Sequence, residues 1–136
     1  MTANITISID IPRSRIYDLI VTANETGSGY WARVISETIP EGADLSWMED
    51  PEDAKRWPHH AAALCGGSVT YGEVNEDTGR VGRKRYTLDA AAIARGLAIM
   101  ATEHAQHFAD LMTENDDMYT ADVFLQLCLF GDVRYG

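Results

Sequence analysis

The sequence is poor in basic residues. It has 11 lysines and arginines against 21 aspartates and glutamates, which gives a formal net charge of -10 at pH 7. Attraction to nucleic acid comes from Lys and Arg neutralising phosphates, so we expect no direct contact with nucleic acid. A basic protein surface is the better partner, because complementary fields speed encounter. Solubility alone explains the same acidic excess equally well.

Long apolar runs and a cysteine framework are also missing. No apolar stretch approaches the roughly 18 residues that span a bilayer, and residues 1–4 lack the basic and apolar segments of a signal peptide. We therefore expect no membrane partner and a location in the cytoplasm. Cys65 and Cys128 are far apart and show no metal-like spacing, so we expect two buried, reduced thiols. A disulfide or a nucleophile is the alternative for this pair.

The length of 136 residues predicts one domain, 1–136. Isoleucines alternate with polar residues from Asn4 to Ile11, which predicts a half-buried strand. Pro12 then opens a helix with Ile16, Leu19, Ile20 and Ala23 buried. Ala32 to Ile39 is expected to form a second strand, in which Val34 and either Ile35 or Ile39 point inward.

A hairpin is expected next. Its first strand runs from Val69 to about Val74, Asn75–Gly79 is the turn, and Val81 to Leu88 is the returning strand. Asp132 to Gly136 adds a short terminal strand in this interpretation.

Three short helices are predicted between Tyr86 and Gly131, capped by Thr87 or Asp89 at the first and by Thr120 at the third. Gly131 ends the last helix. The order of elements predicts an α+β fold, with an antiparallel sheet of three to five strands, helices packed on one face, and a mainly helical C-terminal half.

Catalytic and metal-binding patterns are weak. Ser28 does not lie in a Gly-x-Ser-x-Gly elbow, and there is no phosphate-binding loop. His104 and His107 are expected to straddle a break between two helices, and no Cys or acid completes a known zinc spacing. We therefore expect a non-enzymatic protein with no metal and no cofactor.

Two surfaces could bind a partner. The segments 37–53 and 103–122 are rich in acid and contain no Lys or Arg. If the fold brings them together, they display carboxylates much as a nucleic acid displays phosphates. The proposed partner-binding residues are Glu49, Asp50, Glu52, Asp53, Glu114, Asp116 and Asp117.

The other candidate is an aromatic pocket near the turn Gly27–Trp31, suited to a planar ligand such as a nucleobase. It consists of Tyr30, Trp31, Trp47, Trp57, Arg83 and Arg85. The purely structural alternative for Gly27-Ser28-Gly29 is a helix C-cap followed by a chain reversal. For Arg83 and Arg85 it is a charged outer strand face that discourages edge pairing.

Two stretches together resemble a family of small proteins carried by tailed phages and prophages, for which no activity is known to us. The first is Gly27-Ser28-Gly29-Tyr30-Trp31, where the family tends to have Ser-Asn in place of Ser28-Gly29. The second runs from His107 to Asp110 and on through Asp122-Val123-Phe124-Leu125-Gln126 to Leu129-Phe130-Gly131. The resemblance implies a phage setting and supplies no catalytic residue.

Small acidic phage proteins often antagonise bacterial defence, so the resemblance implies an inhibitor acting in the host-cell cytoplasm. Our first hypothesis is an anti-CRISPR-type protein that binds the nucleic-acid-recognising surface of an effector complex. The alternatives are a module that sequesters a nucleotide signal and a structural or regulatory phage protein. A homodimer is left open.

Overall fold

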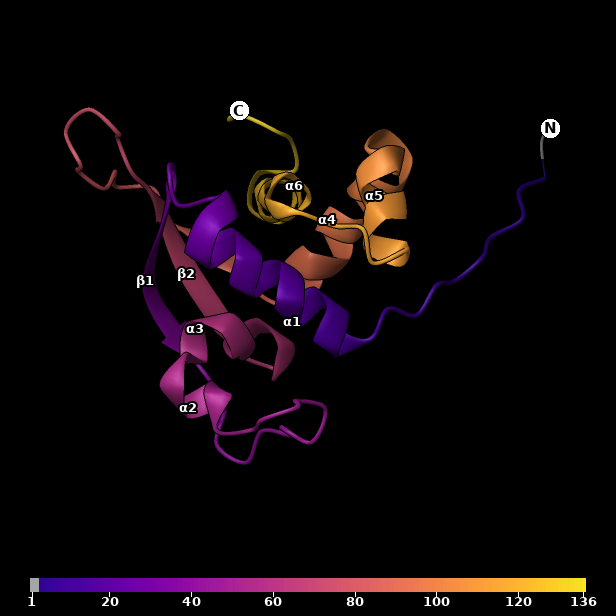
Figure 1. The fold of residues 1–136 in the computed structure, drawn as a ribbon, viewed down its shortest axis with the longest axis horizontal. Coiled ribbons are helices and arrows are strands. Elements are labelled where there is room, and N and C mark those ends of the chain that lie inside the picture. The colour runs from indigo at the N-terminus through magenta and orange to yellow at the C-terminus, as the bar shows by residue number, and fades with distance from the viewer. Residues whose placement is uncertain (1–2) are drawn as a thin grey trace.

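A three-stranded antiparallel sheet, covered by helices on one face, is the frame of the protein (Figure 1). The computed structural model describes residues 3–136. Strands β1 (Ala32–Thr38), β2 (Ser68–Glu73) and β3 (Tyr86–Leu88) lie side by side in that order. The expected α+β class and the largely helical C-terminal half are confirmed.

The pairing of β1 with β2 decides which isoleucine points inward. Val34 lies opposite Tyr71, and the register shifts between Val34 and Ser36. Such a bulge leaves an extra residue unpaired. That residue is Ile35, which is 43% exposed, whereas Ile39 packs against the core.

Helix α1 (Arg13–Thr22) crosses the sheet and continues through one π-helical turn, Ala23–Gly27. Pro12 takes the N-cap position, because its missing N–H would have no helical partner there. The predicted inward positions of this helix are all buried: Ile16, Leu19, Ile20 and Ala23.

The segment between β1 and β2 is mostly irregular. It contains helices α2 (Asp53–Arg56) and α3 (Pro58–Ala61) and a 3-10 turn, Ala62–Leu64. This segment builds a small second hydrophobic cluster from Met48, Ala54, Ala61 and Cys65. Tyr17 of α1 and Trp47 pack on that cluster, so the long loop is anchored to the body.

The C-terminal half contains α4 (Ala90–Glu103), α5 (Ala105–Met112) and α6 (Met118–Phe130). Asp89 caps α4 by accepting a hydrogen bond from the Ala92 N–H at 2.9 Å. The predicted Thr120 cap is wrong: Asp117 accepts the N–H of Thr120 at 3.0 Å, and Thr120 is buried one turn inside α6. Gly131 ends α6 with a φ of 77°, as expected.

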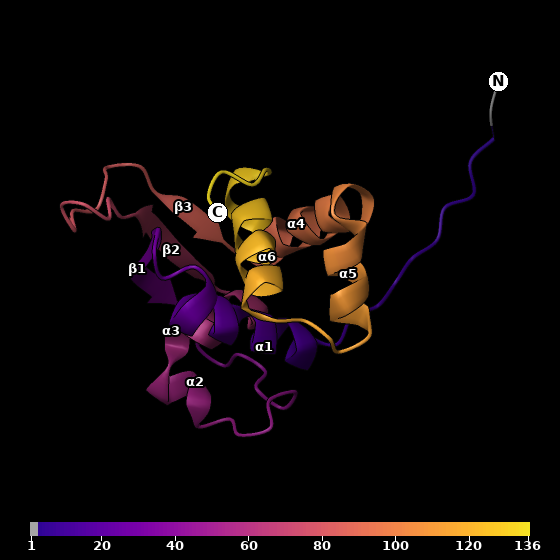
Figure 2. The ribbon, with the colours of Figure 1, turned by 45° about the horizontal axis from the view of Figure 1, so that its top comes forward.

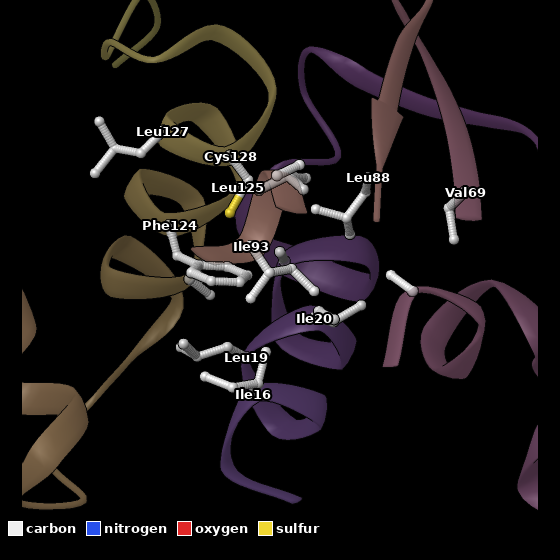
Figure 3. Close-up of a cluster of buried hydrophobic side chains, with 14 of the residues drawn as sticks. Ile16, Leu19, Ile20, Val69, Leu88, Ile93, Phe124, Leu125, Leu127 and Cys128 are labelled. Atoms are coloured by element: carbon white, nitrogen blue, oxygen red, sulfur yellow. The ribbon is translucent and has the colours of Figure 1, made fainter. Parts of the chain in front are cut away.

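The main core lies between the sheet, α1, α4 and α6 (Figure 3). Phe124 and Leu125 of α6 meet Ile20 of α1 and Leu88 of β3 there. Helices α4 and α6 approach closely at Gly96, where an added Cβ would lie 2.9 Å from the Cα of Cys128. No helix among residues 3–136 is both long and apolar enough to cross a lipid bilayer.

The predicted strand from Asn4 to Ile11 is wrong. Residues 3–11 form an extended arm that leaves the body in both views (Figures 1 and 2), and Ile5 and Ile7 are 94% and 75% exposed. Alternation describes a side-chain pattern, but a strand also needs a neighbouring strand to pair with. The arm has none within the described residues.

Two further strands are shorter than predicted or absent. The returning hairpin strand is Tyr86–Leu88, preceded by one isolated bridge between Val81 and Val74. Between them Arg85 donates to the carbonyl of Gly82 at 2.6 Å, so the chain bends locally. Residues 132–136 form no strand, because the Gln126 side chain takes up their backbone groups.

Candidate protein-binding face

The two acidic segments meet on either side of α1, with Asp18 between them. Partial burial raises the pKa of Asp18; Arg15 opposes this shift, and the negative charges of Asp116, Glu49 and Glu114 add to it. The acidic loop before α2 and the α5–α6 connection accordingly flank the first turns of α1 (Figures 1 and 2). The sequence analysis missed Asp18, because it lies in a helix outside both acid-rich segments.

The first acidic segment continues this face past Tyr17. Burial is the main cause of the raised pKa of the Tyr17 hydroxyl. The negative charges of four nearby carboxylates raise this pKa further: Asp53, Asp18, Glu25 and Asp50. We call the whole set the acidic face. It comprises Asp18, Glu49, Asp50, Asp53, Glu114 and Asp116.

Basic side chains neutralise part of this charge. Arg15 contacts Asp116 at 2.8 Å and also donates to the Leu111 carbonyl at 2.6 Å. Arg56 pairs with Asp50 at 3.0 Å and with Asp53 at 2.8 Å. These two cations are held between acids of the face, so six carboxylates surround two arginines and a negative surplus remains.

The other two nominated acids have local roles. Glu52 pairs with Lys55 at 3.6 Å, and both side chains are largely exposed. Asp117 caps α6, and the N–H of Thr120 that it accepts is the main reason why its pKa is lowered. Glu49 and Asp18, by contrast, make no ion pair within the part of the chain that the structure describes.

The structure does not bring the proposed aromatic pocket together. Trp31 is 1% exposed and lies in the main core, stacked on Tyr135 with ring centroids 5.3 Å apart. Trp47 packs edge-on against Tyr17 in the second cluster, and Trp57 is 45% exposed. The tryptophans therefore occupy three separate environments.

The turn that holds Tyr30 and Trp31 is tied to α6 through Asp122. This buried carboxylate accepts hydrogen bonds from Ser28 Oγ at 2.8 Å, Tyr30 Oη at 2.6 Å and Trp31 Nε1 at 2.7 Å. Asp122 therefore lies inside the molecule and adds nothing to an acidic surface. Its sequence signal is an acid within the otherwise apolar run Ala121–Leu125.

A hollow of about 610 Å³ lies beside Tyr30, lined also by Glu73, Glu76, Arg80 and Tyr135. Glu73 accepts hydrogen bonds from the hydroxyls of Tyr86, at 2.6 Å, and Tyr135. Partial burial favours a raised pKa for Glu73, but these hydrogen bonds prevail and lower it. The bond to Glu73 also raises the pKa of Tyr135 to about 12.

Arg83 and Arg85, the two arginines proposed for the aromatic pocket, do not line this hollow. Arg83 and Arg85 are exposed on the bend before β3, and Arg85 donates to the carbonyls of Gly82 and Lys84. These bonds hold the Arg85 guanidinium against its own backbone.

The histidines and cysteines of the described chain do not cluster as metal ligands do. Among residues 3–136, no three His, Cys, Asp or Glu side chains lie close enough to hold a metal ion. Cys65 and Cys128 are free and buried, and burial raises the pKa of both thiols.

Comparisons with known proteins found nothing similar. No protein-family model, no curated protein and no solved structure matches the chain.

Proposed function

We propose that this protein is a non-enzymatic phage or prophage inhibitor that binds, through its acidic face, the nucleic-acid-recognising surface of a bacterial defence complex. One observation carries the proposal: two acidic segments, about 60 residues apart in the sequence, flank the first turns of α1 (Figures 1 and 2), where their charges act on Asp18. The charges are thus gathered around Asp18 of α1, where they act together on a cationic surface.

The partial neutralisation by Arg15 and Arg56 shapes this proposal. An exposed ion pair contributes little stability, but it fixes the positions of its carboxylates. Glu49 and Asp18 remain free to meet cations of a partner. A partner that normally binds phosphates supplies such cations, because Arg and Lys dominate its contacts.

The phage setting and the CRISPR effector as first target come from the family resemblance alone. The likeness covers the Gly27–Trp31 turn and the segment from His107 to Gly131, so it rests on residues that mainly build the fold. A structural or regulatory phage protein would carry the same residues. Phage infection of defended and undefended hosts separates the two functions, since only an inhibitor raises phage yield selectively in defended hosts.

The nucleotide-binding alternative receives less support. The hollow beside Tyr30 offers Arg80 to a phosphate, but Glu73 and Glu76 line the same space and repel an anion. A thermal-shift panel of nucleotides tests this alternative: stabilisation by one member, lost on Arg80→Ala, would favour it over the acidic face.

The acidic face is tested by charge reversal at Glu49 and Glu114, two exposed residues whose replacement leaves the core intact. The double variant Glu49→Lys/Glu114→Lys should weaken binding to purified CRISPR effectors, and their inhibition, by tenfold or more. Added salt should weaken wild-type binding steeply. The matched control Glu37→Lys/Asp77→Lys makes the same charge change on exposed residues outside the face. Equal loss in both double variants, or indifference to salt, would contradict the proposal.

A further inference from the structure

The extended arm, residues 3–11, has an unpaired backbone. Among the described residues, no hydrogen bond joins any of its N–H or C=O groups to another part of the chain. An extended segment with free backbone groups is a template for pairing with another strand. The arm also carries isoleucines on one face, with Ile5, Ile7 and Ile9 exposed by 94%, 75% and 51%.

An apolar groove lies between this arm and α4. It has a volume of about 630 Å³, and its walls include Ile7 and Ile9 on one side and Ile93, Leu97 and Ala98 on the other. Arg13 is the one charged residue that lines it within the described chain. One wall of the groove is therefore helix α4, and the other is the extended arm, which has no neighbouring strand among the described residues.

Charge distribution indicates which occupant fits. Residues 3–9 contain no charged side chain, and α4 contains only Arg95 before Glu103. Two molecules that each carry a net charge of -10 repel one another wherever their acids meet. Asp10 of the arm and Arg13 of the groove carry opposite charges, so the arm and the groove together offer a region without net charge where a second copy can approach without that repulsion.

The dimensions agree with such an arrangement. Nine extended residues span about 30 Å, whereas the 14 residues of α4 are about 21 Å long. A second arm laid beside the first can therefore cover the whole length of the helix.

We propose that the protein forms a symmetric dimer in which the two arms pair antiparallel and the isoleucines of each fill the groove of the other copy. A two-fold axis makes the contact closed and identical in both copies. Pairing satisfies the free backbone groups, and burial removes the isoleucines from water. None of the six carboxylates of the acidic face lines the groove, so either proposal can fail alone.

Sedimentation analysis of the full chain tests the dimer, with circular dichroism to confirm folding. Ile7→Asp and Ala98→Glu change exposed positions, one on the arm and one on α4, and each should weaken dimerisation by about a hundredfold because its effect occurs twice per dimer. Ala91→Glu, an exposed α4 position outside the groove, is the matched control and should remain dimeric. Added salt should strengthen the dimer, opposite to its effect on the acidic face.

Cysteine cross-linking tests the arm pairing itself. In an antiparallel pair about a two-fold axis near the arm's centre, Thr6 faces Ser8 when the axis lies at residue 7, and each faces its own copy when the axis lies at residue 6 or 8. The double variant Thr6→Cys/Ser8→Cys should therefore form an intermolecular disulfide in any of these registers, while Asp77→Cys in the distant hairpin should not. A monomeric wild type at 100 micromolar (about 1.5 mg/ml), a dimer that survives Ile7→Asp and Ala98→Glu, or an arm that never cross-links would each overturn the proposal.

Discussion

At the scale of single residues, Asp122 joins two segments that are about 90 positions apart in the chain. Its carboxylate is buried, and every donor that faces it belongs to the Ser28–Trp31 turn. Buried charges are tolerated where hydrogen bonds replace the lost water. These hydrogen bonds therefore hold the turn against α6.

Asp122→Ala should destabilise the protein by about 3 kcal/mol or more, because three donors lose their acceptor. Urea unfolding measures the change. Asp132→Ala, which removes an exposed carboxylate paired with Arg134, is the control and should cost less than about 0.5 kcal/mol. Equal costs for the two variants would mean that the Asp122 hydrogen bonds add no stability.

His60 makes stability depend on pH. Desolvation, and then the neighbouring His59, lower its pKa below the ordinary 6.5. Asn24 Nδ2 can only donate, so His60 Nδ1, 3.0 Å away, must accept and the ring is neutral. Below about pH 6.5 the unfolded chain binds the proton more readily than the folded one, so stability falls as pH falls through that window.

We therefore expect His60→Gln to flatten the decline of unfolding free energy between pH 7 and pH 5.5. Glutamine keeps an acceptor for Asn24 but has no proton to take up. Urea unfolding at several pH values provides the measurement, with His104→Gln as the control that keeps the slope. An unchanged slope in His60→Gln would assign the pH dependence to another group.

At the scale of elements, α4 and α6 pack most closely at Gly96. A side chain there would meet both the backbone and the sulfur of Cys128. Gly96→Ala should therefore lower the unfolding free energy by about 1–2 kcal/mol net, since overpacking outweighs the gain of roughly 1 kcal/mol in helix propensity. Gly29→Ala meets no atom within 4 Å and should be nearly neutral in the same thermal or urea experiment. A stabilised Gly96→Ala would show that the helices can separate at no cost.

Elements with local signals were predictable from sequence. The apolar spacing of α1 and the left-handed Gly131 follow from residues within one or two turns. Elements that depend on a distant partner were not predictable. The arm has the side-chain pattern of a strand but no neighbouring strand to pair with among the described residues. After α6, the Gln126 side chain accepts the backbone N–H groups of Arg134 and Tyr135, which a strand would need for pairing. The predicted N-cap of α6 was wrong by about one turn, because Asp117 and Thr120 are both favourable N-cap residues and a helix has only one N-cap position.

The candidate site follows the same rule. The acid content of the two segments was visible in the sequence, but their meeting at Asp18 depends on how α1 crosses the body. Trp31 and Trp47 pack in different hydrophobic clusters and Trp57 stays half exposed, a distribution that composition does not encode.

At the scale of the whole molecule, the crowding of carboxylates around α1 opposes folding at low ionic strength. Asp18→Asn should raise the urea midpoint in dilute buffer, because it removes the cost of partly burying a charge and relieves repulsion from Asp116, Glu49 and Glu114, which together outweigh the lost attraction to Arg15. The gain should shrink at 0.5 M salt, where charges farther apart than a few ångströms are screened. Asp77→Asn, in the distant hairpin, is the control. A gain that does not depend on salt would assign the effect to burial of the Asp18 carboxylate instead of repulsion between carboxylates.

The separation of the tryptophans has a practical use in spectroscopy. Trp31 lies in a dry environment against a tyrosine ring, while almost half of the Trp57 surface already touches solvent. On unfolding, the emission of Trp31 moves to longer wavelength and that of Trp57 hardly changes. In a protein with phenylalanine at positions 47 and 57, intrinsic fluorescence would report the opening of the main core alone.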